Sequence, residues 1–332
     1  MHHLLSKFMS QLDRIFFSFG IVVALIILLL TAPAKAANQT VLPMSATEFF
    51  KLGVEETQRE HYEDAIKDFT QAIELDTKFA TAYSNRCLVQ LQLGKYKKAA
   101  EDCTAALQLN PNNTEAYLNR GLAYYRLGNY PAAISDYQAI IALDSNDFRA
   151  YYNRGLARFE LKDYEGAIAD YNETLLKSHQ HLEPLQADVY NDRGLAQLML
   201  ENVTSAIADF SRAITLDSNN HRAFYNRACA CHKKRDFIGA IEDFTIALQL
   251  DPNHAEAYLN RGLIHHEIGL QQAALSDLQT ASKHFDEQGN QVAYQRTLAL
   301  IERLKQLLKS SDKTAIAFFP SRVLLGRMRD EG

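Results

Sequence analysis

The sequence predicts an all-α fold, in which seven helix–turn–helix repeats stack into a solenoid that ends in a capping helix. Three observations predict this fold. The heptapeptide AYLNRGL occurs twice, at 116–122 and 257–263, within a longer internal repeat. Small and aromatic residues recur in every repeat at spacings that suit helices. The chain also has only 14 Gly and 7 Pro among its 332 residues, too few for the many turns of an all-β fold.

The first 36 residues differ from the rest of the chain. Lys7 and Arg14 precede an apolar run over 15–30, and the small-x-small tripeptide AKA follows at 34–36. A basic start, an apolar stretch and such a tripeptide are typical of a secretory signal peptide. We therefore expect residues 1–36 to be a signal peptide that is cleaved after Ala36.

The alternative is an uncleaved membrane anchor around residues 15–33. The apolar run is slightly shorter than the roughly 20 residues that a spanning helix needs. Because the positive charge precedes the apolar run, both interpretations send the rest of the chain across a membrane. The expected location is a periplasm, a lumen or the extracellular space. With an anchor, the array would be held at the membrane on the translocated side.

The repeat period is 34 residues. Variants of the heptapeptide recur at this interval, except that an insertion of five residues lengthens one step. The insertion lies within residues 177–188. A weaker first copy, EFFKLGV, begins one period before the second. The seven repeats start at Glu48, Ala82, Ala116, Ala150, Val189, Ala223 and Ala257.

Each repeat contains two predicted helices, and positions within it are counted from offset 0, its first residue. In the first helix, offset 1 is always aromatic and offset 5 is always small. In the second helix, offset 17 is always Ala and offset 21 is aromatic in five repeats. On a helix these offsets share one face, so we expect the two helices to pack closely through their small residues.

A 34-residue helix–turn–helix repeat with this pattern resembles the tetratricopeptide repeat (TPR) family. The resemblance covers residues 46–290 and implies a right-handed α-solenoid. Because a single hairpin cannot bury its apolar stripe, the last repeat needs a cover. The apolar spacing over residues 291–309 predicts this capping helix. The tail, residues 310–332, contains AIAFFP and VLLG among basic residues, and it is either disordered or docked on the array.

Catalysis has little support in the sequence. It contains no P-loop, no HExxH zinc motif and no G-x-S-x-G nucleophile elbow, so we expect no enzyme and no cofactor. His265 and His266 are neighbours that point about 100° apart on a helix, which does not suit a shared metal. The inserted residues His179, His181 and Glu183 are only a weak metal candidate. The net charge of −5 argues against nucleic acid as a partner.

The resemblance implies a binding site on the first helices, because in the TPR family these helices line a concave surface that binds extended peptides. Offset 3 is mostly Asn, which offers both a donor and an acceptor to a peptide backbone. The alternative is that this Asn bonds locally or to water. The predicted peptide-binding residues at offset 3 are Asn85, Asn119, Asn153, Asp192, Asn226 and Asn260. Those at offset 6 are Leu88, Leu122, Leu156, Leu195 and Leu263.

The predicted function is therefore an exported, non-catalytic scaffold that binds a protein or peptide partner. The alternative is an accessory subunit or a small-ligand binder. In that case the site would lie in the insertion at 177–188 or in the C-terminal tail.

Two further pairings are predicted. Arg occupies offset 4 in six repeats and Asp occupies offset 20 in all seven, so we expect an Arg–Asp pair that joins a first and a second helix, either within one hairpin or between hairpins. The first repeat has Leu52 at offset 4, so Asp68 should lack this partner. In the second repeat, Cys87 and Cys103 replace the usual residues at offsets 5 and 21. They are expected to form a disulfide, and the alternative is two small buried thiols.

Overall fold

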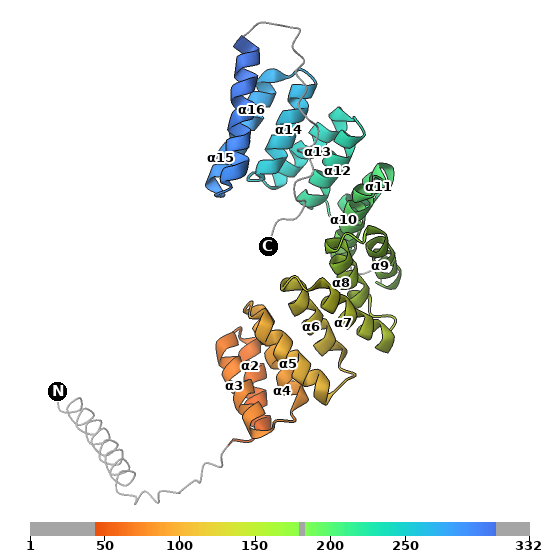
Figure 1. Cartoon of the computed structure of the whole chain (residues 1–332), viewed down its shortest axis with the longest axis vertical. Coiled ribbons are helices and arrows are strands. Elements are labelled where there is room, and N and C mark those ends of the chain that lie inside the picture. Colours follow the sequence, from red (N-terminus) through yellow and green to blue (C-terminus); the bar gives the residue numbers. More distant parts are fainter. Residues whose placement is uncertain (1–43, 179–182, 310–332) are drawn as a thin grey trace, which may run out of the picture. The chain divides into compact units, whose positions relative to one another are not determined.

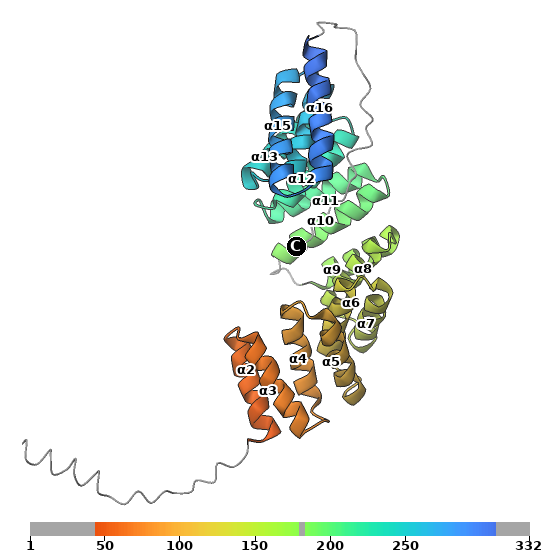
Figure 2. The same ribbon diagram turned by 60° about the vertical axis from the view of Figure 1, so that its left-hand side comes forward.

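The computed structural model describes residues 44–178 and 183–309. The predicted signal peptide or anchor, the histidines of the insertion and the tail lie outside these ranges. The described chain is all-α and forms a solenoid of helical hairpins, in which each helix lies beside the next one along the chain (Figures 1 and 2).

The helices pair in sequence order, and each pair corresponds to one predicted repeat. The first four pairs are α2 (Ala46–Gln58) with α3 (Tyr62–Leu75), α4 (Ala80–Gln92) with α5 (Tyr96–Leu109), α6 (Thr114–Arg126) with α7 (Tyr130–Leu143), and α8 (Phe148–Glu160) with α9 (Tyr164–Lys177). The other three are α10 (Glu183–Met199) with α11 (Val203–Leu216), α12 (His221–Lys233) with α13 (Phe237–Leu250), and α14 (Ala255–Glu267) with α15 (Gln271–Glu287).

A left-handed backbone residue at offset 12 ends the first helix of every pair. This conformation closes the helix and turns the chain into the second helix. Glycine adopts it without strain, whereas other residues adopt it at a cost. The residues with positive φ at this offset are Glu60, Gly94, Gly128, Lys162, Glu201, Arg235 and Gly269.

The core of each hairpin forms where offset 5 meets offset 21. A Cβ placed on Gly121 would lie 2.6 Å from the ring of Tyr137, and one on Gly155 would lie 2.7 Å from the ring of Tyr171. Both rings are almost fully buried. A small residue at offset 5 is therefore required because the ring of the second helix lies directly against the first helix.

The five-residue insertion mainly lengthens α10. This helix has 17 residues, whereas α8 and α12 each have 13. The extra residues form one more turn at its N-terminus, where Pro184 is the second residue. Proline is tolerated there because the first helical N–H groups have no partner within the helix. α10 packs against both α9 and α11, so the stack continues across the insertion.

The last described helix, α16 (Gln291–Lys309), packs on α15. Its Ile301 and Leu304 are buried in one cluster with Ala274 and Leu278 of α15. α16 therefore covers the apolar side of the last pair. None of the helices within 44–178 and 183–309 is both long enough and apolar enough to span a membrane.

Candidate functional site: the exposed face of the first helices

The predicted peptide-binding residues of α4, α6 and α8 remain partly exposed. Asn85, Asn119 and Asn153 are half-buried. Asn85 Nδ2 donates to the carbonyl oxygen of Thr81, and Asn153 Nδ2 donates to that of Arg149, both at 2.8 Å. Asn85 and Asn153 therefore make local hydrogen bonds, which was the alternative to peptide binding at offset 3. The oxygen atoms of these two side chains accept no hydrogen bond from the described residues.

The equivalent residues of α10, α12 and α14 are buried, in contrast to the uniform exposed row that we expected from the sequence. Asp192, Asn226 and Asn260 are only 3–4% exposed. Each is hydrogen-bonded to the first helix of the preceding pair, so its polar group is used inside the stack. These three side chains are therefore part of the packing and are removed from the candidate binding face.

The partner is in each case the residue at offset 2 of the preceding repeat. Tyr152 donates its hydroxyl hydrogen to Asp192 at 2.9 Å. Asn226 Nδ2 donates to Asn191 Oδ1 at 2.8 Å. Asn260 Nδ2 donates to the hydroxyl oxygen of Tyr225 at 3.0 Å. These contacts tie α8 to α10, α10 to α12 and α12 to α14.

The first three repeats do not provide the same arrangement. Their offset 2 residues are Phe50, Ser84 and Leu118. Phe and Leu cannot hydrogen-bond, and the short Ser84 side chain is not bonded to Asn119 in the structure. The residue type at offset 2 therefore indicates whether the offset 3 residue of the next repeat can be bonded. This could be predicted from the sequence only if it were known that offsets 2 and 3 meet between neighbouring first helices.

The leucines at offset 6 divide differently from the residues at offset 3. Leu88 is 36% exposed, whereas Leu195 is only 1% exposed. Leu122 is half-buried against the core between α4, α5 and α6, and Leu156 is half-buried against the core that includes Ala167 and Tyr171 of its own hairpin. Leu263 of α14 is also half-buried. The apolar part of the face is thus partly exposed on α4, α6, α8 and α14, and it is closed on α10.

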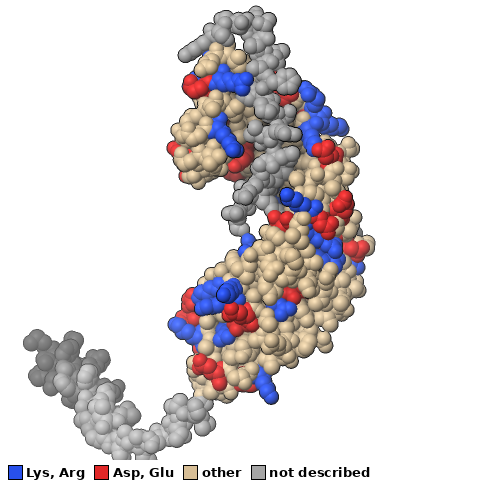
Figure 3. All heavy atoms as spheres, viewed as in Figure 1, with Lys and Arg blue, Asp and Glu red and all other residues tan. Residues whose placement is uncertain are grey.

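The charge of Arg149, beside this face, is compensated by two carboxylates. Arg149 of α8 contacts Glu115 of α6 at 2.7 Å and Asp147 at 2.8 Å. On the side shown in Figure 3, Lys and Arg side chains are interspersed with Asp and Glu. The candidate face of α4, α6 and α8 therefore combines amide and apolar groups with the paired charge of Arg149.

The predicted Arg–Asp pairs hold the face in place, and the structure confirms them in six repeats. Each Arg at offset 4 reaches the Asp at offset 20 of its own hairpin, with the shortest N–O distances between 2.6 and 2.8 Å. The pairs are Arg86–Asp102, Arg120–Asp136, Arg154–Asp170, Arg193–Asp209, Arg227–Asp243 and Arg261–Asp277.

Most of these arginines also bond to the preceding hairpin, a contact that was not predicted from the sequence. Arg86 donates to the hydroxyl oxygen of Thr70 at 2.9 Å, and Arg120 donates to that of Thr104 at 3.1 Å. Arg193, Arg227 and Arg261 make the equivalent contacts to Asn172, Ser211 and Thr245. One guanidinium group thus joins the two helices of its own hairpin and fixes that hairpin to its neighbour.

Asp68 is the exception, as the sequence predicted. Leu52 stands at offset 4 of its repeat, and no basic side chain of the described residues forms an ion pair with Asp68. Burial raises the pKa of the Asp68 carboxyl, and the negative charges of Glu56 and Asp64 raise it further.

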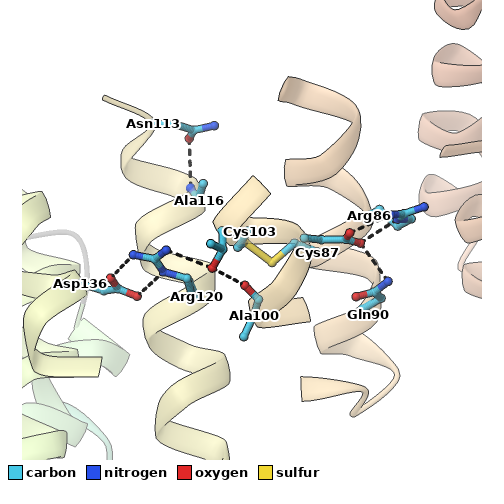
Figure 4. The surroundings of a disulfide bond; sticks show 11 residues. Arg86, Cys87, Gln90, Ala100, Cys103, Asn113, Ala116, Arg120 and Asp136 are labelled. Atoms are coloured by element: carbon cyan, nitrogen blue, oxygen red, sulfur yellow. Dashed lines mark hydrogen bonds and ion pairs between the residues drawn. A yellow bond between two sulfur atoms is a disulfide. The ribbon is translucent and has the colours of Figure 1, made fainter. Parts of the chain in front are cut away.

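Cys87 and Cys103 are bonded to each other in the structure, with 5.5 Å between their Cα atoms (Figure 4). They occupy offsets 5 and 21, the same pair of positions that a glycine and a ring fill in other hairpins. Both are fully buried between α4 and α5. Cys229 and Cys231 are free and buried.

The histidines do not assemble a metal site among the described residues. His265 lies 3.0 Å from Asp277 Oδ2, so it is used in packing, and His266 lies 2.6 Å from the side-chain oxygen of Gln271. His179 and His181 lie outside the described residues, and so does the side chain of Glu183.

Comparisons with known proteins agree with this architecture. Family models described as tetratricopeptide repeat match residues 118–178, 173–221, 80–113 and 221–254, and one described as TPR repeat matches 53–94. A comparison with curated proteins gives no match.

Among solved structures, a tetratricopeptide repeat protein from Parabacteroides merdae matches with a TM-score of 0.61 and 18% identity, over 76% of this chain and 98% of that one. The pilF protein of Pseudomonas aeruginosa matches with a TM-score of 0.56 and 22% identity, over 66% and 96%. The Cut9–Hcn1 hetero-tetramer of the APC/C matches with the same score and identity, over 66% and 42%. At these identities the structures show the fold alone, and with the family models they identify the chain as a member of the tetratricopeptide repeat family.

Proposed function

We propose that this chain is an exported, non-catalytic scaffold that binds an extended segment of a protein partner along α4, α6 and α8. One observation carries the proposal. The amide and leucine side chains of these helices remain partly exposed, whereas most of their counterparts on α10, α12 and α14 are consumed by packing. The family and the fold support a protein-interaction role. The contrast between the two groups of helices supports α4, α6 and α8 as the part of the array that binds the partner.

The orientation of the asparagines favours a ligand that donates hydrogen bonds. In Asn85 and Asn153 the Nδ2 atom faces a carbonyl oxygen of the same helix, which can only accept. The Oδ1 atom is therefore the one left for a ligand, and the main-chain N–H of an extended segment is a suitable donor.

The spacing of the helices suits such a segment. Packed helices lie about 8–10 Å apart, and an extended chain rises about 3.3 Å per residue. About every third residue of the ligand would therefore meet the next asparagine. Between these points, Leu88, Leu122 and Leu156 provide apolar contacts for ligand side chains.

Export is part of the proposal and is supported by the composition of residues 1–36. If the signal peptide is cleaved, the mature chain begins at Ala37, and mass spectrometry of the protein from its native host would detect this terminus. A chain that retains residues 15–33 and remains with membranes after alkaline extraction would instead support the anchor.

The binding proposal is tested by capture of the partner from the native envelope. Wild-type protein is compared with the N119A/N153A variant, and the bound proteins are identified by mass spectrometry. Selective loss of one partner from the variant, with unchanged thermal stability, supports the proposal. Equal recovery of every partner by both proteins contradicts it. Of the alternative sites, residues 179–182 of the insertion and the tail at 310–332 lie outside the described residues.

A further inference from the structure

His254 replaces an asparagine cap at the start of α14. In the equivalent positions before α6 and α12, Asn113 accepts a hydrogen bond from the amide of Ala116, and Asn220 accepts one from Ala223, both at 3.0 Å (Figure 4 shows the first). In the last repeat, the Nδ1 atom of His254 accepts from the amide of Ala257 at 3.2 Å. A ring nitrogen thus performs the task of a side-chain oxygen.

This contact fixes the protonation state of the ring. Nδ1 can accept a hydrogen bond only when it carries no proton, so the capping form is the neutral imidazole with its hydrogen on Nε2. Protonation turns Nδ1 into a donor and abolishes the cap. It also places a positive charge at the N-terminus of α14, where the helix dipole disfavours one. Asparagine has no such transition.

Three titratable side chains face the ring. His221 of α12 lies 6.4 Å away between ring centroids, and Tyr225 of α12 stacks on it at 4.6 Å. Glu256 of α14 has a carboxylate oxygen 3.6 Å from Nδ1. A proton on Nδ1 could point to this carboxylate, but it would occupy the lone pair that accepts the hydrogen bond from the amide of Ala257.

The ring also belongs to the contact between the last two hairpins. Its side chain is only 10% exposed. The hydroxyl of Tyr225, on which it stacks, accepts the hydrogen bond from Asn260 that ties α12 to α14. A change at His254 therefore acts on both the first turn of α14 and the α12–α14 contact.

We propose that His254 is a pH-sensitive cap, whose protonation releases the first turn of α14 and loosens the contact between α12 and α14. The capping bond, the stacked Tyr225 and the nearby His221 together carry the proposal. Histidine side chains in general change charge between about pH 5 and 8, and the test is therefore made near the two ends of that range. The His254 cap is separate from the candidate binding face on α4, α6 and α8.

The test is hydrogen–deuterium exchange of the full chain at about pH 7.5 and about pH 5.5, with rates corrected for the intrinsic effect of pH on exchange. The readout is the protection of the first-turn amides of α14, Ala257 above all. In the wild type we expect protection to fall about fivefold or more at the lower pH, as the loss of a typical cap predicts. Unchanged protection in the wild type would overturn the proposal.

Two variants isolate the histidine. H254N restores the asparagine that caps α6 and α12, so it should keep its protection at both pH values. H232Q is the matched control, because His232 also crosses between α12 and α14, where it contacts Glu267 at 3.1 Å. The H232Q variant should lose protection at the Ala257 amide at the lower pH, as the wild type does. The same loss of protection in H254N as in the wild type would show that the response does not come from His254.

Discussion

Arg120 and Asp136 are joined by two hydrogen bonds between the helices of one hairpin, from Nη2 to Oδ1 at 2.7 Å and from Nε to Oδ2 at 2.9 Å. Their side chains are 18% and 5% exposed. The same guanidinium group bonds to Thr104 of the preceding hairpin. The pair therefore links α5, α6 and α7 through one side chain.

The first prediction is that R120A destabilises the array by about 3–5 kcal/mol, because it leaves the buried Asp136 carboxylate without its partner. R154A should cost less, because Arg158 remains 2.9 Å from Asp170 and continues to neutralise it. Both are measured by denaturant unfolding beside the wild type. Equal losses below about 1 kcal/mol would show that the pairs behave as exposed surface ion pairs.

The second prediction concerns Asp68. Its pKa is raised in the folded chain, so its charged form is disfavoured by folding and lowers stability at neutral pH. D68N should therefore raise the free energy of unfolding at pH 7, by about 0.5 kcal/mol. The difference between the variant and the wild type should shrink as the pH falls and the wild-type carboxyl is protonated. A difference that grows at low pH would contradict this assignment.

The third prediction concerns the disulfide between Cys87 and Cys103. Protein that is denatured without reduction should show two free thiols and a linked peptide containing Cys87 and Cys103. Four free thiols would refute the disulfide. The count requires denaturant because Cys229 and Cys231 are buried, and burial raises the pKa of the Cys229 thiol to about 12, which keeps it in the unreactive thiol form.

The disulfide also has a replacement that the other repeats suggest. C87A/C103A should destabilise the array by about 3 kcal/mol, the value expected for a loop of this length. C87G/C103Y restores the glycine and tyrosine that Gly121 and Tyr137 provide in the next hairpin, so it should recover part of the loss. Thermal unfolding of both variants under oxidising conditions measures this. No recovery by C87G/C103Y would indicate that the second hairpin has a different spacing.

The sequence predicted more of the framework than of the site. The period, the Arg–Asp pairs and the contact of offsets 5 and 21 follow from residue types that recur in most or all of the repeats, because the same packing recurs there. Whether the side chain at offset 3 is buried or exposed depends instead on a neighbouring residue in another repeat. Asn226 is buried because Asn191 meets it, whereas Asn119 faces a neighbour that does not bond to it. A single column of residues could not reveal this difference.

The fourth prediction follows from that division. N226A should destabilise the array by about 1–3 kcal/mol, because it leaves the buried amide oxygen of Asn191 unsatisfied. N119A should change stability by less than about 0.5 kcal/mol, because the Asn119 side chain makes no hydrogen bond with the described residues. Denaturant unfolding compares the two. A larger loss in N119A would reveal a structural role for the residue and would weaken its assignment to a binding face.

The most direct measurement of the binding proposal is photo-cross-linking in the native host. A photoreactive amino acid is placed at Leu88 or Leu122 on the candidate face, and at Leu176 of α9 as the control, since that side chain is 77% exposed on a second helix. Adducts to the same partner from positions 88 and 122, absent at 176 and reduced by N119A/N153A, are the expected result. Adducts that form equally from 176, or persist unchanged in N119A/N153A, would contradict binding along α4, α6 and α8.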